Sequence, residues 1–283
     1  MRLTIKTLKN LIVEMLEQQE QIQRINELDM SEVGEACYVG GSTHALMTCK
    51  IKGGDFFLKF SDSWDFKNSD DKSIQIGVEY LAYLIYSLYP SNIPQEIHVV
   101  SDPQNQRIGI ATQKSGSKIG RQVDFNQWVK SISGGAMADI FLANWDVANT
   151  SNFVIDDSGK ANRVDPGGSL TFRARGGRKG DSFSPKAGEL KTMLDPNMRG
   201  GAGWLLSQVD MKEACEAFIA VPWESIDQKI EQARAEVTKE LNNANLAQVV
   251  DQWNKECDHI KTVLKSRWAD VKDHCEHALQ QMQ

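Results

Sequence analysis

Residues 144–168 constrain this chain more than any other segment, because acidic, amide and glycine residues stand around two short strand-like segments. Asp146 is followed six positions later by Asn152, and the apolar run 153–155 then leads into an Asp-Asp-Ser-Gly turn. A second short run delivers Asp165 directly before Pro-Gly-Gly. The pattern predicts a β-hairpin with oxygen-bearing side chains at its base. Such oxygens are the ligands that Mg²⁺ prefers, so the segment indicates either a magnesium–phosphate site or a surface hairpin with polar turns.

The upstream part of the chain contains a lysine in an unusual setting. Residues 37–45 read as a glycine turn flanked by strand-like residues, and residues 46–51 and 55–60 predict two strands joined by a Gly-Gly turn. Lys59 stands among aromatic and aliphatic residues on the second strand. Burying an ammonium group is costly unless it meets an anion, which a phosphate or a helix glutamate would supply. The alternative is a lysine at a strand end that extends to water.

The next apolar segment, residues 74–88, has the period of a helix and contains one acidic residue, Glu79. A lysine on a strand followed by a glutamate on the next helix has the order of the ion pair that positions phosphates in kinases. The sequence therefore predicts that Lys59 and Glu79 meet.

Residues 33–196 taken together resemble an atypical member of the protein-kinase-like superfamily, close to the HipA-type and phosphatidylinositol 3- and 4-kinase-like branch. This resemblance implies a two-lobed α+β fold with a small β-rich N-lobe, a mainly helical C-lobe, and ATP with Mg²⁺ or Mn²⁺ in the cleft. The expected division is a helical extension over residues 1–32, the N-lobe over 33–115 and the C-lobe over 116–283. It also favours a bacterial source.

The resemblance assigns a role to each matching residue. The phosphate-covering loop would be Gly40, Gly41 and Ser42, and the phosphate-binding lysine and its helix partner would be Lys59 and Glu79. The interlobe strand would be residues 108–114, with Gln113 near the nucleotide. Asp146 would be the catalytic-loop Asp that orients the acceptor hydroxyl, and Asn152 and Asp165 would be the metal ligands. The chain departs from the family pattern at four points, the first of which is a short glycine loop that lacks the full Gly-x-Gly-x-x-Gly pattern. Asn-Trp-Asp replaces His-Arg-Asp, five residues instead of four separate Asp146 from Asn152, and Pro166 replaces the Phe after the metal-binding Asp.

The reaction that the resemblance implies is transfer of the γ-phosphoryl group of ATP to a hydroxyl, first of a protein Ser or Thr and second of a phosphoinositide-type lipid. A catalytically silent pseudokinase scaffold and transfer of AMP are the other readings that the sequence leaves open.

Residues 171–191 form a basic segment with six Lys or Arg and two acidic residues, in a chain whose net charge is −6. Clustered arginines and glycines favour phosphate-rich ligands. Arg173, Arg175, Arg178 and Lys179 are therefore candidates for an anion site, and an inositol polyphosphate is a candidate activator. The alternative is a solvated loop whose charge aids solubility.

The rest of the sequence limits the classes of protein to which the chain can belong. Its net negative charge argues against general nucleic-acid binding, and we find no apolar run of membrane-spanning length. Its five cysteines are expected to be reduced thiols, which favours the cytoplasm, either of the producing cell or of a host into which the protein is delivered. Helical periods are expected over residues 5–28, 125–144 with a break at Gly134-Gly135, and from residue 204 onward.

Overall fold

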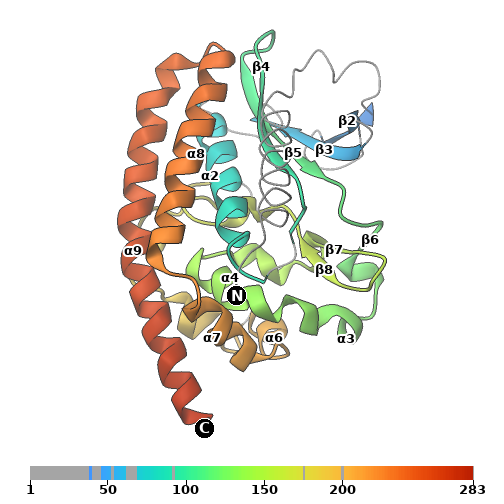
Figure 1. The fold of residues 1–283 in the computed structure, drawn as a ribbon, viewed down its shortest axis with the longest axis vertical. Helices are drawn as coiled ribbons and strands as arrows, with labels where there is room; N and C mark the ends of the chain where they lie inside the picture. The colour runs from blue at the N-terminus through green and yellow to red at the C-terminus, as the bar shows by residue number, and fades with distance from the viewer. Residues whose placement is uncertain are drawn as a thin grey trace, which may run out of the picture.

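The computed structural model describes residues 38–39, 46–51, 54–61, 69–90, 93–174, 176–198 and 201–282. These residues form an α+β structure with two antiparallel sheets and a mostly helical remainder (Figure 1). The expected helix over residues 5–28 and the glycine turn with Gly40, Gly41 and Ser42 lie outside the described residues.

The larger sheet holds Lys59 at its centre. Its strand order is β1-β2-β3-β5-β4, and every neighbouring pair is antiparallel. Lys59 lies on the central strand, opposite Leu46 on one side and Ile110 on the other. The strands expected over residues 46–51, 55–60 and 108–114 are confirmed. The five strands are β1 (Tyr38–Val39), β2 (Leu46–Ile51), β3 (Gly54–Phe60), β4 (Ile97–Asp102) and β5 (Arg107–Gln113).

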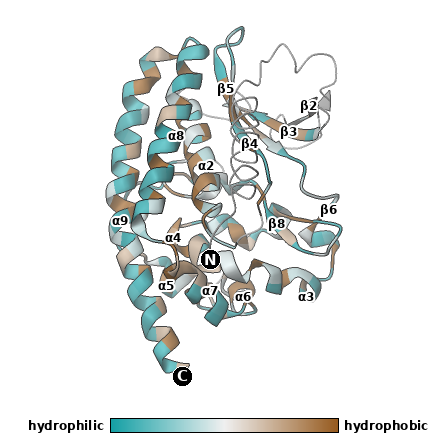
Figure 2. Ribbon diagram, in the orientation of Figure 1, coloured by the Kyte–Doolittle hydropathy of each residue, from teal (hydrophilic) through white to brown (hydrophobic). Residues whose placement is uncertain are grey.

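Helix α2 (Ser69–Tyr86) is the element that connects the sheet to the helices. It packs against β5 on one side and against α8 (Trp223–Asn243) on the other, and every residue from Ser73 to Tyr86 is buried. A helix covered on all sides is expected to carry apolar residues around its whole circumference, and brown residues run along much of α2 in Figure 2. Glu79 is therefore an acid inside an apolar environment.

A second, three-stranded sheet contains the hairpin predicted from residues 153–164. Its order is β6-β7-β8, with β6 (Lys118–Ile119), β7 (Phe153–Ile155) and β8 (Ala161–Arg163) all antiparallel. The Asp156 carboxylate closes the turn by accepting hydrogen bonds from the backbone N–H groups of Ser158 and Lys160. The hairpin prediction is confirmed.

The helical segment before the hairpin is interrupted, and the glycines at which a break was predicted form the end of the interruption. It consists of α3 (Phe125–Trp128), a 3-10 stretch η4 (Val129–Gly135) and α4 (Ala136–Phe141). A Cβ atom on Gly134 would lie 2.6 Å from the carbonyl oxygen of Pro90, so this glycine permits a close backbone approach within the 3-10 stretch that precedes α4.

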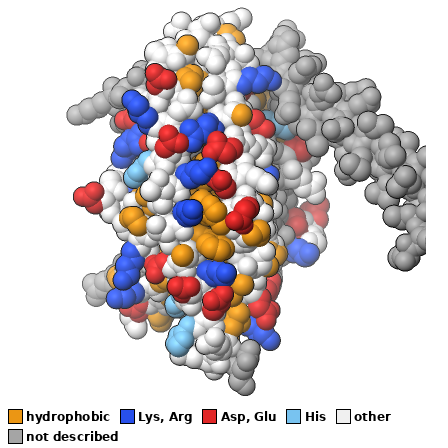
Figure 3. All heavy atoms as spheres, turned by 60° about the vertical axis from the view of Figure 1, so that its left-hand side comes forward, with side chains coloured by type: hydrophobic (Ala, Val, Ile, Leu, Met, Phe, Trp, Pro, Cys, Tyr) orange, Lys and Arg blue, Asp and Glu red, His pale blue; other side chains and the backbone are white. Residues whose placement is uncertain are grey.

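The C-terminal part is helical and ends in two long helices that lie side by side (Figure 1). Trp253, Ile260 and Leu264 form part of the buried stripe of α9, which confirms the expected amphipathic pattern. On the outer face drawn in Figure 3, basic and acidic side chains are interleaved, and Lys261 pairs with Asp227 and Glu231 across the two helices. The helices are α5 (Glu189–Thr192), α6 (Gly203–Leu206), α7 (Met211–Ile219), α8, and α9 (Val250–Gln281).

The cysteines depart in part from the expectation that all five are reduced. Cys49 on β2 is in a disulfide, whereas Cys215, Cys257 and Cys275 are free and buried. Spacing along the sequence does not show which cysteines the folded chain brings together, so the expectation was wrong for Cys49.

Across the described residues, the helices are all too short or too polar to cross a membrane.

Candidate functional site

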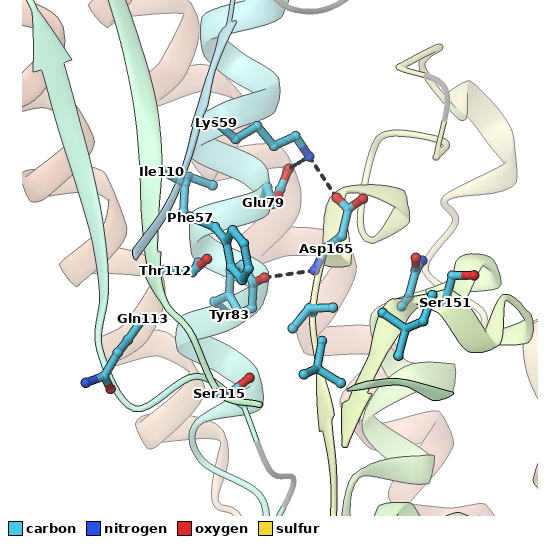
Figure 4. A pocket seen from close by; sticks show the side chains of 14 residues that line it. Phe57, Lys59, Glu79, Tyr83, Ile110, Thr112, Gln113, Ser115, Ser151 and Asp165 are labelled. Atoms are coloured by element: carbon cyan, nitrogen blue, oxygen red, sulfur yellow. Dashed lines mark hydrogen bonds and ion pairs between the residues drawn. The ribbon is translucent and has the colours of Figure 1, made fainter. Parts of the chain in front are cut away.

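Lys59 is the centre of a three-residue charge cluster drawn from three distant parts of the chain. Its Nζ atom lies 2.8 Å from Oε2 of Glu79 on α2 and 2.7 Å from Oδ1 of Asp165, which follows β8 (Figure 4). Lys59 is buried, with 8% of its surface exposed. The predicted meeting of Lys59 with Glu79 is confirmed, and Asp165 joins them.

Two carboxylates share this single ammonium group, and they differ in burial. The Glu79 side chain is 3% exposed, whereas that of Asp165 is 41% exposed. Burial, followed by the charge of Asp165, outweighs the effect of Lys59 and raises the pKa of Glu79 to about 7. Burial disfavours the charge of Lys59, but Asp165 and Glu79 together outweigh it and raise the pKa of this lysine. Asp165 is therefore the more exposed of the two carboxylates, and the ammonium group of Lys59 lies beside it.

The turn that carries Asp165 has a specific backbone conformation. Asp165 adopts left-handed dihedral angles, with φ 54° and ψ 57°, and its N–H donates a hydrogen bond of 2.8 Å to the Tyr83 hydroxyl. The following residues form the short 3-10 turn η7 (Pro166–Gly168). A Cβ atom on Gly167 would lie 2.8 Å from Oε2 of Glu79, so glycine allows α2 to approach this turn.

Asp146 and Asn152 are brought together despite their unusual spacing. They lie in two consecutive 3-10 turns, η5 (Trp145–Ala148) and η6 (Thr150–Asn152). Nδ2 of Asn152 donates a 2.7 Å hydrogen bond to Oδ2 of Asp146. A Cβ atom on Gly168 would lie 2.9 Å from Cβ of Asp146, which shows that this residue lies against η7. Asp146 and Asn152 therefore contact each other, and Asp146 packs against the turn that follows Asp165.

A pocket of about 350 Å³ is lined by the charge cluster and by residues of both sheets. Its charged end contains Lys59, Glu79 and Asp165, while Gln113 lies toward the opposite end (Figure 4). An apolar pocket with a few convergent polar groups is the usual form of a small-molecule site. Asn152 also lines it, and Asp146 does not. Its other lining residues are Phe57, Tyr83, Ile110, Thr112, Ser115, Ile119, Ser151, Val154 and Val164.

Two tyrosines that sequence reasoning missed support this site from α2. Tyr83 holds the backbone of Asp165, and the hydroxyl of Tyr86 donates to the buried carboxylate of Asp139 at 2.7 Å and accepts from Nδ2 of Asn144 at 2.9 Å. With Glu79 they are spaced by four and then three residues, which places all three on one face of the helix. That spacing was visible in the sequence, but it looked like ordinary apolar periodicity.

The basic segment is less open to ligands than its composition suggests. Arg178 forms ion pairs with Glu256 at 2.8 Å and with Asp71 at 3.1 Å. Lys179 is buried and donates to two backbone carbonyl oxygens. Arg173 is exposed, and Arg175 lies outside the described residues. Because acidic side chains and carbonyl groups of the protein already occupy Arg178 and Lys179, these two do not project into an open anion site.

A scan against protein-family models and searches of curated proteins and of solved structures find no match for this chain.

Proposed function

We propose that this protein is an ATP- and Mg²⁺-dependent phosphotransferase with a two-lobed, kinase-like arrangement. In this proposal the five-stranded sheet and α2 form the small lobe, and the three-stranded sheet with the following helices forms the large lobe. The pocket lined by both would hold the nucleotide. The observation that carries the proposal is the position of Lys59 between a buried glutamate and an exposed aspartate at the polar end of an apolar pocket.

The charge distribution suits a nucleotide phosphate. Phosphoryl transfer is catalysed mainly by positioning and by stabilising charge on phosphate oxygens. Lys59 would supply a cation whose stem is already fixed by β3 and whose ammonium is held by Glu79. The apolar walls, which include Phe57, Ile110 and Val154, would accept a flat base.

In this proposal Asp165 and Asn152 would also hold a magnesium ion. Asp165 has a partly exposed carboxylate in the pocket, and Asn152 lines the same pocket. The amide nitrogen of Asn152 donates to Asp146, so the atom it would offer to a cation is Oδ1. Oxygen ligands of this kind suit Mg²⁺, which when bound would neutralise phosphate charge. Asp146 would accept the hydrogen bond of the acceptor hydroxyl and orient it.

The acceptor that we propose first is a protein Ser or Thr hydroxyl, with a phosphoinositide-type headgroup as the alternative. Because the reaction consumes ATP, we place it in a cytosol, either of the producing cell or of a host.

Parallel incubations with γ-labelled and α-labelled ATP test this proposal. The full-length protein is given Mg²⁺, candidate proteins and lipid vesicles in separate reactions. Label from γ-labelled ATP alone on an acceptor supports phosphoryl transfer, and label from α-labelled ATP would show AMP transfer instead. ATP binding without any transfer would indicate a pseudokinase.

Matched variants connect the result to the site. Asp165→Ala should abolish transfer, whereas Asp157→Ala, which changes an exposed aspartate in the turn of the same hairpin, should leave it unchanged. Transfer by Asp165→Ala at the wild-type rate would overturn the assignment of the metal site.

A further inference from the structure

Two loops that carry proposed functional groups pack directly against each other. We call residues 142–146 the Asp146 loop and residues 165–170 the Asp165 loop. The N–H of Leu170 donates a 2.7 Å hydrogen bond to the carbonyl oxygen of Leu142, and only glycine at position 168 leaves room for Asp146. The relative position of the two loops therefore sets the relative position of Asp146 and Asp165.

Lys179 connects these loops from a buried position. Its Nζ atom donates to the carbonyl oxygen of Ala143 at 2.6 Å and to that of Gly168 at 2.8 Å. Only 6% of its surface is exposed. Its own backbone N–H donates to the carbonyl oxygen of Thr171, which fixes the point from which the side chain extends. A single side chain thus binds one carbonyl group in each loop.

Both loops contain non-glycine residues in the left-handed conformation. Ala143 has φ 52°, Asp165 has φ 54° and Leu170 has φ 55°. This conformation costs a non-glycine residue about 1–2 kcal/mol, so it persists only where surrounding contacts hold it. Lys179 binds the carbonyl group of one of the three, Ala143, and that of Gly168, two residues before another.

The protonation state of Lys179 does not decide whether it can make both bonds. Burial, together with the charges of Arg267 and Arg173, outweighs those of Glu189 and Asp146 and lowers the pKa of Lys179 to about 7. An ammonium group has three N–H donors and a neutral amine has two, so either form can serve both carbonyl oxygens.

We infer that Lys179 is a positioning residue for phosphoryl transfer, because it fixes the spacing between the Asp146 loop and the Asp165 loop. This inference rests on the proposed function. Lys179 does not line the pocket in which the nucleotide would bind. It therefore acts on the geometry of the reacting groups and not on nucleotide affinity.

The test compares Lys179→Met with Lys186→Met, which changes an exposed lysine of the same basic segment. Methionine has a side chain of similar length and removes the amino group that donates both hydrogen bonds. For Lys179→Met, we expect kcat per folded molecule to fall about a hundredfold, as small misplacements of reacting groups do, while KM for ATP stays within about twofold of wild type. Lys186→Met should match wild type in both.

Hydrogen–deuterium exchange supplies a readout that does not depend on activity. In Lys179→Met, amide exchange should become faster in residues 142–146 and 165–170 and stay unchanged in α8 and α9. Lys179→Leu, which also lacks an N–H donor, serves for the same measurements if the methionine variant does not fold.

The outcomes separate the two proposals. If wild type transfers phosphate and Lys179→Met does so with an unchanged kcat, only the positioning role fails. Unchanged exchange in both loops would also overturn that role. If wild type transfers nothing, the proposed function fails. Faster exchange in Lys179→Met would then show that Lys179 holds the two loops together in a protein that does not catalyse phosphoryl transfer.

Discussion

Replacing Lys59 by Met tests the charge balance of the pocket most directly. Methionine has a similar stem, so a volume-conserving swap at this position would by itself cost less than about 1.5 kcal/mol. The structure adds a second effect, because Glu79 and Asp165 share this one ammonium group. Without it, the buried Glu79 carboxylate has lost its cation.

The size of this effect depends on pH. In the wild type the pKa of Glu79 is already raised from 4.5 to about 7, which corresponds to about 3 kcal/mol at about 1.4 kcal/mol for each tenfold change in proton affinity. Removing Lys59 takes away the main influence that lowers this pKa, so it rises further. An acid with a raised folded-state pKa contributes its full stability below its unfolded-state pKa and loses it as pH rises through the folded-state pKa.

Lys59→Met should therefore lose little stability at about pH 6, where Glu79 is protonated in both proteins. By about pH 9 the loss should grow by about 3 kcal/mol, as for a buried ion pair from which one partner is removed. The assay is urea unfolding at both pH values. The exposed Lys130→Met is the control. The double variant Lys59→Met/Glu79→Gln, which has no buried carboxylate at this position, should lose the additional pH dependence.

Two results would refute this reasoning. One is an equal loss of stability at both pH values in Lys59→Met. The other is a double variant as pH-dependent as the single one, which would show that Glu79 is not the responsible charge. In the same preparations, phosphoryl transfer by Lys59→Met should be at least about a hundredfold slower than in wild type.

Three further substitutions test neighbouring parts of the site. Asp165→Ala should remove metal-dependent ATP turnover, measured by phosphate release. Its free energy of unfolding should stay within about 1 kcal/mol of wild type, because this side chain is partly exposed and its charge disfavours the ionised form of Glu79. Tyr83→Phe leaves the N–H of Asp165 without its acceptor and should cost about 1–3 kcal/mol in thermal unfolding; an unchanged melting temperature would contradict the role of this hydroxyl. Gly168→Ala places a Cβ atom 2.9 Å from that of Asp146 and should lower kcat more than about tenfold. Gly188→Ala, which has open space at its Cβ position, should leave kcat unchanged. Equal kcat values in the two variants would argue against close packing of the loops.

Local patterns in the sequence determined the elements and most of the polar candidates. Alternation and turn residues predicted β3 and the β7–β8 hairpin, and helical periodicity predicted α2 with Glu79 on it. These features depend on neighbours a few residues away, which the sequence displays directly. The expectation that Lys59 meets Glu79 also succeeded, because a buried cation needs a nearby anion.

Contacts between distant segments were decided by the tertiary structure alone. Lys59 and Asp165 are 106 positions apart, and nothing local in either segment specifies their distance of 2.7 Å. The burial of Lys179 is another property that the sequence pattern did not reveal. The composition of the basic segment indicated an anion-binding or solvated cation, but the two loops pack around Lys179, and it donates to backbone carbonyl groups instead. A charge pattern states which groups are available, whereas the fold decides which of them reach solvent, because burial is a property of the assembled chain.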